Sequence, residues 1–149
     1  HLFLFLLRRV SMKDIFCKII DGEIPGSKIY EDDDILVILD ISQLTKGHSL
    51  VIPKAHYESV LDCDEEIVAK VYKVAQKVAK ALVKAYNCAG VNILTNAKEA
   101  AGQSVPHFHV HVLPRYDEND GVKIICEEKE PDFGELAKRA DYLKGFIDA

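Results

Sequence analysis

Several residue types that define specialised protein classes are absent or scarce in this sequence. The 149 residues include no tryptophan, one methionine, five prolines and only four cysteines. The cysteines stand far apart, at positions 17, 63, 88 and 126, without close pairing. A disulfide framework of the kind that stabilises small secreted domains is therefore not indicated, and the sequence predicts a reducing compartment. We expect a cytoplasmic protein, which is also nuclear if the source is eukaryotic.

An excess of positive charge is also absent. The formal net charge is −5 and the isoelectric point is near 5.7, which argues against a surface that binds nucleic acid. A small phosphate ligand is not excluded, because it responds to the local field rather than to the net charge. We therefore expect no nucleic-acid partner.

The N-terminal stretch H-L-F-L-F-L-L-R-R-V-S is apolar but short. A membrane span takes about 20 residues, and a signal peptide carries its basic residues before the apolar run, not after it. We therefore expect no membrane partner. We interpret Met12 as the natural start, residues 1–12 as an extension upstream of the domain, and residues 13–149 as a single domain. An amphipathic membrane anchor in residues 1–11 is the alternative.

The pattern of apolar residues predicts both helices and strands. Apolar residues recur at spacings of three and four between Ile67 and Ala85, which predicts a long helix over residues 64–86. Further helices are expected at residues 14–20 and 131–147, and strands at residues 29–31, 35–39, 49–52 and 91–96. Strands and helices that occupy separate parts of the chain are typical of an α+β fold with an antiparallel sheet.

The most informative stretch is Ser104–Pro114, S-V-P-H-F-H-V-H-V-L-P, in which histidine alternates with apolar residues. In a strand, side chains alternate between the two faces. This period would place His107, His109 and His111 on one face, with Phe108, Val110 and Val112 directed into a core. Prolines bracket the run, as is common at strand ends. The pattern therefore predicts a fifth strand that presents three imidazoles.

Three aligned imidazoles suit a catalytic metal site, nucleophilic catalysis, or a polar strand face without chemistry. The preceding Gly102-Gln103-Ser104 supplies backbone N–H groups, an amide and a hydroxyl, and Asn96 adds a second amide. Such donors bind phosphate in a tight loop, whereas a metal site would not need them. The context therefore favours nucleophilic attack on a phosphate group.

Four blocks of the sequence occur in an order typical of one family. They are F-C-K-I-I-D-G-E-I-P, L-D-I-S-Q-L-T-K-G-H-S-L-V-I-P-K-A-H, V-N-I-L-T-N and A-G-Q-S-V-P-H-F-H-V-H-V-L. From about Ile15 to about Arg115, the chain resembles the histidine triad (HIT) nucleotide-binding proteins of the Hint branch. This resemblance implies a five-stranded antiparallel sheet, with dimers that join two sheets into one. It also implies a purine mononucleotide, or a conjugate of one, as the ligand.

We expect His109 to be the nucleophile, because a neutral imidazole attacks phosphorus well near pH 7. His111 is suited to bind a phosphate oxygen and His107 to support the site. The resemblance implies the same role for the middle histidine, with a covalent nucleotidyl-histidine intermediate that water hydrolyses. It also implies that Ser104 acts on P–N substrates. Gln103 and Asn96 match positions that contact phosphate in the family.

Asp40 follows a run of apolar residues, and a carboxylate in this position either reads ribose hydroxyls or starts a turn. The resemblance favours ribose, with Ile41 and Leu39 lining the base pocket. His48 resembles a family histidine that supports the triad from behind. No cofactor is required by this chemistry.

A structural zinc ion is an open alternative. Some relatives bind zinc through C-x-x-C, a later histidine and the first triad histidine. The corresponding residues here are Asp14, Cys17, His56 and His107, so that aspartate replaces the first cysteine. Aspartate also ligates zinc. In the other interpretation, Asp14 only caps a helix and Cys17 is a buried thiol.

The sequence thus predicts a purine nucleotide-binding hydrolase that cleaves nucleoside 5′-phosphoramidates or related nucleotidyl conjugates. The alternatives are a dinucleoside polyphosphate hydrolase, a non-enzymatic nucleotide-binding scaffold and a metalloenzyme that uses the three histidines. A homodimer is expected through the long helix and residues 91–96, because an open sheet edge tends to find a partner. The chain departs from the animal Hint pattern in its tail, which is longer after Pro114 and acidic over residues 116–121.

Overall fold

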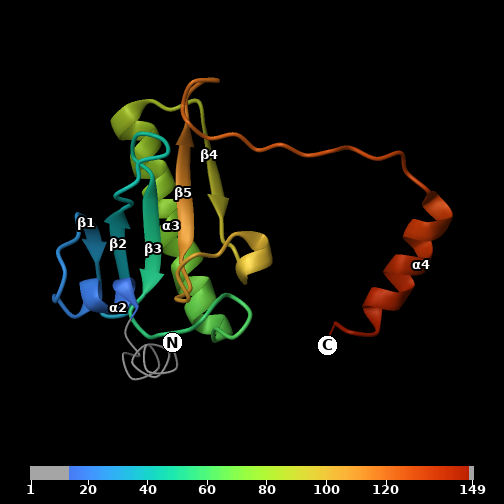
Figure 1. The fold of residues 1–149 in the computed structure, drawn as a ribbon, viewed down its shortest axis with the longest axis horizontal. Helices are drawn as coiled ribbons and strands as arrows, with labels where there is room; N and C mark the ends of the chain where they lie inside the picture. Colours follow the sequence, from blue (N-terminus) through green and yellow to red (C-terminus); the bar gives the residue numbers. More distant parts are fainter. Residues whose placement is uncertain (1–13, 148–149) are drawn as a thin grey trace, which may run out of the picture.

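A five-stranded antiparallel sheet forms the centre of the molecule in the computed structural model, which describes residues 14–147 (Figure 1). The predicted extension over residues 1–12 lies outside this range. The elements are α2 (Ile15–Ile20), β1 (Lys28–Glu31), β2 (Ile35–Leu39), β3 (Ser49–Pro53), α3 (Glu65–Tyr86), β4 (Gly90–Leu94), η1 (Glu99–Ala101), β5 (Val110–Arg115) and α4 (Phe133–Lys144). The predicted α+β class, with one long helix and a C-terminal helix, is confirmed.

The strand order is β1-β2-β3-β5-β4, and each neighbouring pair is antiparallel. Strands β1, β2 and β3 therefore form an antiparallel meander. It does not continue, because α3 carries the chain across the sheet to its far edge, where β4 lies. The chain then turns back, and β5 inserts between β4 and β3.

Helix α3 covers one face of the sheet and the short helix α2 lies on the other (Figure 1). Strand β2 is apolar throughout and separates two cores by alternation. Ile35 and Val37 pack toward α3, whereas Leu36 and Ile38 pack toward Phe16 of α2. Because β2 is buried on both faces, its sequence is a continuous apolar run rather than an alternation of apolar and polar residues.

Helix α3 begins after Asp64 and ends at Asn87, which adopts the left-handed conformation and donates its N–H to the Val83 carbonyl. Its buried residues are Val71, Val74, Ala75, Val78 and Leu82. Gly90 is already the first residue of β4, where it pairs with Arg115. No helix within residues 14–147 combines the length and apolar character that a membrane crossing requires.

Strand β5 begins at Val110, later than predicted, so that His107 and His109 precede the regular strand. It continues through Pro114, which pairs with Val91 instead of ending the strand. A proline fits there because the pairing of β3 with β5 covers only residues 110–112 of β5. The Pro114 carbonyl instead accepts a hydrogen bond from the Thr45 hydroxyl, with Oγ1 and O 2.7 Å apart.

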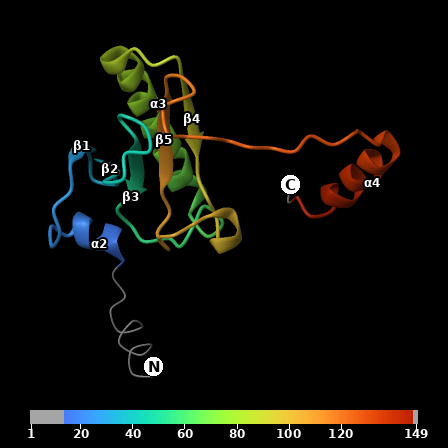
Figure 2. The same cartoon turned by 45° about the horizontal axis from the view of Figure 1, so that its top comes forward.

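The C-terminal part of the chain leaves the sheet. After β5, an extended segment carries α4 well beyond the β4 edge (Figures 1 and 2). Asp132 caps α4 by accepting a hydrogen bond from the Glu135 N–H. The helix ends at Lys144, earlier than the predicted Ile147, and it buries none of its residues in the described chain.

Candidate active site

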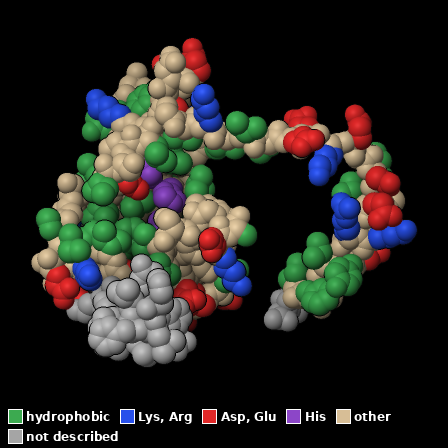
Figure 3. Space-filling view, viewed as in Figure 1, with side chains coloured by type: hydrophobic (Ala, Val, Ile, Leu, Met, Phe, Trp, Pro, Cys, Tyr) green, Lys and Arg blue, Asp and Glu red, His purple; other side chains and the backbone are tan. Residues whose placement is uncertain are grey.

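The alternation predicted for the histidine stretch is confirmed, although the strand itself is shorter. Phe108, Val110 and Val112 are fully buried in the core that α3 covers. The three histidines lie on the opposite face, where the Phe16 ring contacts His107 and His109 edge-on. Figure 3 shows histidine atoms at the surface, between the apolar side of β1–β3 and the loops on the β4 side. The sheet therefore separates the imidazoles from its main core.

His109 is held at both its ring and its backbone. Its ring Nδ1 lies 2.7 Å from the His107 carbonyl oxygen. Because a carbonyl only accepts, we assign the N–H of this ring to Nδ1. The Thr95 hydroxyl donates to the His109 carbonyl, with Oγ1 and O 2.6 Å apart. This tautomer leaves the lone pair of Nε2 free, which is the atom that a nucleophilic histidine uses.

Burial lowers the pKa values of His109 and His111. The pKa of His109 is lowered below its ordinary value, because desolvation disfavours the imidazolium more than its hydrogen bond to His107 favours it. Burial lowers the pKa of His111 to about 4, with His109 and His48 adding repulsion. Both imidazoles are therefore unprotonated at pH 7.

Behind His111 lies a short chain of polar groups. Nε2 of His48 is 3.0 Å from Nδ1 of His111 and 3.7 Å from the carboxylate of Asp40. His48 is 1% exposed, and burial lowers its pKa against the opposing attraction of Asp40. The other carboxylate oxygen of Asp40 accepts from the Ser42 N–H at 2.8 Å. Asp40 and His48 thus lie where they can orient His111, as the interpretation of His48 supposes.

The phosphate-binding residues expected before β5 do not all point to the histidines. Gln103 uses its amide within the loop, because Nε2 donates to the carbonyls of Glu58 and Val105 and Oε1 accepts from the Lys98 N–H. The Asn96 amide lies against Gly102. Ser104 is exposed, and an open cavity of about 890 Å³ lies beside it. The hydrogen bonds of the Gln103 amide therefore stabilise the loop that carries Ser104.

Lys98 adopts a backbone conformation that residues other than glycine rarely adopt, with φ 73° and ψ 164°. This region is essentially restricted to glycine and costs of order 1–3 kcal/mol for other residues. We predict that Lys98→Gly raises the free energy of unfolding by about 1 kcal/mol, since the relieved strain exceeds the extra chain entropy of glycine. Urea unfolding measures the change. Lys98→Ala is the control and gives no such gain, and a gain as large for alanine would contradict the strain.

The two residues expected to line a base pocket lie on different sides. Leu39 faces the α3 side of the sheet, where it lines an apolar cavity with residues of α3. Ile41 is 99% exposed in the loop after β2. Ile38 and Ile20 lie in the apolar cluster on the histidine face. The structure thus brings Ile38 and Ile20 toward the triad, but not Leu39.

A second cluster joins α2 to the histidine stretch, and it contains all four residues proposed for zinc. The Asp14 carboxylate oxygen Oδ2 lies 3.1 Å from Nδ1 of His107 and 3.1 Å from Nε2 of His56. The Cys17 sulfur lies 3.5 Å from the same Nδ1. Asp14 also caps α2, because its Oδ1 accepts from the Cys17 N–H. The two interpretations of Asp14 are therefore compatible.

The donor set fits a cation. Nε2 of His107 lies 2.8 Å from the Pro53 carbonyl, which assigns a proton to that nitrogen. In the neutral ring, Nδ1 then carries a lone pair that faces the Asp14 carboxylate, and two acceptors at 3.1 Å repel unless a proton or metal ion lies between them. A carboxylate, a thiolate and two imidazoles are ligand types that zinc accepts.

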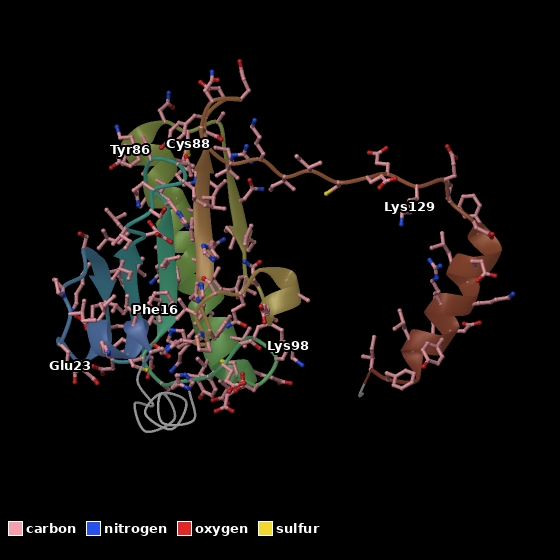
Figure 4. All side chains as sticks on the ribbon, viewed as in Figure 1. Phe16, Glu23, Tyr86, Cys88, Lys98 and Lys129 are labelled. Atoms are coloured by element: carbon pink, nitrogen blue, oxygen red, sulfur yellow. The ribbon has the colours of Figure 1, made fainter. Side chains whose placement is uncertain are left out.

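Three contributors to the site were missed by the sequence reasoning. Phe16 packs against the triad from α2 (Figure 4). In the sequence, Phe16 is marked only as an apolar residue of a short predicted helix. Thr95 was adjacent to Asn96 but was not singled out. The Pro53 carbonyl has no side-chain signal at all, because any residue supplies a carbonyl.

Comparisons with known proteins agree with this geometry. A model of the HIT domain matches residues 21–118. An adenosine 5′-monophosphoramidase from Saccharomyces cerevisiae is 38% identical over 124 residues, covering 83% of this chain and 76% of that protein. An adenylylsulfatase from Arabidopsis thaliana is 45% identical over 101 residues, covering 68% of this chain and 51% of that protein.

Solved structures show the same fold. A HIT family protein from Bacillus anthracis is 43% identical, with a TM-score of 0.87 and coverage of 92% of this chain and 99% of that chain. A zinc-bound histidine triad family protein from Mycobacterium smegmatis is 37% identical, with a TM-score of 0.70, and it also covers 92% of this chain and 99% of its own. Together with the histidine triad on one face of the sheet, these matches establish that the chain belongs to the HIT-domain family.

Proposed function

We propose that this protein is a nucleotide hydrolase that cleaves purine nucleoside 5′-phosphoramidates or related nucleotidyl conjugates. The observation that carries the proposal is the hydrogen bond between Nδ1 of His109 and the His107 carbonyl, 2.7 Å long, which leaves Nε2 as the nucleophile. The phosphoramidase and adenylylsulfatase named above both act on nucleotidyl compounds, and their similarity to this chain supports the same class.

The proposed reaction has two steps. Nε2 of His109 attacks the α-phosphorus, a P–N bond forms to the ring, and the bond from phosphorus to the leaving amine breaks. The amine departs with a proton that the Ser104 hydroxyl passes on from solvent, and the water that attacks in the second step returns one proton to solvent. Water then attacks the nucleotidyl-histidine, which releases the mononucleotide and restores the neutral ring. His111 donates from its outer nitrogen to a phosphate oxygen, and His48 behind it holds the ring in that orientation.

The proposed nucleotide site extends from the triad to the end of β2. Asp40 would accept from the ribose hydroxyls, with Ile41, Ile38 and Ile20 near the base. Leu39 is left out, because it lies on the other face of the sheet. Asn96 remains a candidate phosphate contact beside the loop, and Gln103 holds that loop in place.

We predict that Asp40→Asn weakens ribonucleotide binding by about tenfold or more, because charge-assisted hydrogen bonds contribute roughly 1.5–3 kcal/mol. Calorimetric titration with AMP and with its 2′,3′-dideoxy analogue measures this loss, which should be confined to the ribose form. Asp33→Asn, in the exposed turn before β2, is the matched control. Equal losses for both ligands would mean that Asp40 acts through His48 or the Ser42 turn instead.

We also propose that Asp14, Cys17 and His107, whose ligand atoms lie close together, bind a structural zinc ion. His56 lies beside them and would be the fourth ligand once its Nε2 leaves the Pro106 carbonyl, 2.9 Å away. A zinc-bound relative supports the proposal. The ion would fasten α2 to the histidine stretch and would take no part in the reaction. We predict about one zinc per chain by elemental analysis, with a melting temperature that falls on chelation. Cys17→Ser should lose the zinc and Cys63→Ser should keep it. A metal-free wild type, unaffected by added zinc, would contradict the site.

A homodimer is proposed through α3 and the edge strand β4. Between them lies a small apolar depression lined by Ala79, Val83, Val91 and Ile93. Val83 is 43% exposed and Ile93 is 40% exposed. An open strand edge beside an apolar patch favours pairing with a second copy.

A further inference from the structure

The face of the sheet that α3 covers contains an apolar groove without an occupant among the described residues. It has a volume of about 320 Å³ and lies between α3 and the β1–β2 edge. Its lining includes Ile29, Leu39, Val74, Val78, Ala81 and Ala85, with Lys77 at its rim. Nearly all of its surface is apolar, and Ile29 is 49% exposed there. The groove lies on the opposite side of the sheet from the triad, so it is not the nucleotide site.

The C-terminal helix presents the complementary surface. Phe133, Leu136 and Leu143 recur along one side of α4, and Phe146 follows it. Phe133 is 78% exposed and Phe146 is 68% exposed. Every hydrogen bond and ion pair of α4 in the described chain is made within residues 132–146. A 12-residue helix without tertiary contacts is marginal in water, so α4 requires a surface on which to pack.

The direction of the arm, residues 122–147, decides between the groove of the same copy and that of a second copy. The arm leaves the sheet on the β4 side and carries α4 beyond that edge (Figures 1 and 2). The groove lies at the β1 edge, at the other end of the strand order β1-β2-β3-β5-β4. A second copy that pairs along β4 about a two-fold axis repeats this order in reverse, and its β1 edge lies on the side toward which the arm extends.

Charge supports the same placement, and a solved relative supports the presence of the arm. The segment before α4 carries Glu127, Glu128, Glu130 and Asp132 around Lys129 (Figure 4), whereas α3 carries five exposed lysines. An acidic arm that crosses a lysine-rich helix is favoured electrostatically. The Bacillus anthracis structure covers 92% of this chain, which is not reached without arm residues. The TM-score of 0.87 therefore supports a similar arm in a crystallised relative.

We propose that α4 of each copy docks in the apolar groove between α3 and the β1–β2 edge of a second copy. The exchange is reciprocal, so that each arm buries its apolar side in the partner and fills the partner's groove. The dimer is then held by two crossed arms in addition to the β4 contact.

Disulfide trapping tests the exchange in the full-length chain. In a Cys126→Ser background, one variant carries Ala81→Cys in the groove and the other carries Leu136→Cys or Leu143→Cys on α4. The two are co-expressed and oxidised with glutathione disulfide. We expect a covalent dimer of one chain of each kind on a non-reducing gel. Ala69→Cys, exposed on α3 outside the groove, replaces Ala81→Cys in the control and should give no such dimer.

Two results would overturn the proposal. One is a disulfide that forms only within a single chain carrying both cysteines, which would place α4 on its own domain. The other is no disulfide from any α4 position while sedimentation shows a dimer, which would leave the β4 contact alone. As a second measurement, Ala81→Glu should expose the arm to trypsin at Lys129 by tenfold or more in rate, whereas Ala69→Glu should leave the cleavage rate unchanged. Equal rates in both variants would also contradict docking.

Discussion

Replacing His109 by asparagine is expected to lower turnover of a nucleoside phosphoramidate by more than about 10³-fold, as the loss of a nucleophile typically does. The affinity for AMP should change little, because asparagine fills a similar space and still offers Nδ2 as a donor near the His107 carbonyl. Turnover is lost because the Nε2 lone pair that attacks phosphorus has no counterpart in the variant. Steady-state rates and calorimetric titration of AMP measure the two effects separately.

The covalent intermediate can be observed directly. Rapid acid quench of the wild type with a substrate labelled in the nucleotidyl group should trap label on the protein, and the variant should retain none.

The pKa of His109 lies below its ordinary value, so the ring stays neutral and reactive somewhat below pH 6.5. The rate should therefore fall only at more acidic pH, when His109 becomes protonated. An undiminished rate in the variant would exclude His109 as the nucleophile.

Ser104→Ala is expected to slow cleavage of adenosine phosphoramidate by about 10²-fold or more, within the 10²–10⁴-fold range of general acid catalysis. An amine is a poor leaving group unless it is protonated, whereas a phosphate oxyanion departs without help. Ser104 is the hydroxyl on the loop that leads to the triad, and its side chain is exposed. The variant should therefore cleave an activated phosphate ester at nearly the wild-type rate.

The same comparison separates the two candidate substrates. We expect the wild type to cleave adenosine phosphoramidate faster than a dinucleoside polyphosphate. Ser27→Ala, an exposed serine before β1, controls for the loss of a hydroxyl and should affect neither rate. If the polyphosphate is the better substrate, or if Ser104→Ala slows both reactions equally, the protein is better described as a polyphosphate hydrolase.

The elements that could be predicted from the sequence are those with a local periodic signal. Helix α3 was predicted within one residue at its start, because its apolar spacing extends over several turns. Strand β2 was predicted with its observed bounds, because five apolar residues between polar ones leave few alternatives. Strand β5 was less accurate, because Pro106 and Pro114 resemble strand ends, and only the pairing with β3 and β4 shows that Pro114 is tolerated.

The contacts of individual side chains followed no such signal. Gln103 matched a phosphate-contacting position, yet its amide is used by the carbonyls of Glu58 and Val105. Leu39 adjoins Asp40 in the sequence, but neighbouring residues of a strand face opposite sides, so only one of the two reaches the histidine face. The sequence pattern predicts Leu39 and Asp40 in one site because a pattern of residue types does not show the direction of each side chain.

The family, the α+β plan and the placement of three histidines on one face all follow from the amino-acid sequence, because they depend on residue types and on a period of two. The tertiary structure decided which nitrogen of His109 is free, since a carbonyl of its own chain sets the tautomer. It also decided that Asp14, Cys17 and His56 meet at His107, and that the apolar side of α4 lies away from its own sheet. Distances between residues far apart in the chain arise only when the sheet is assembled, and no local pattern encodes them.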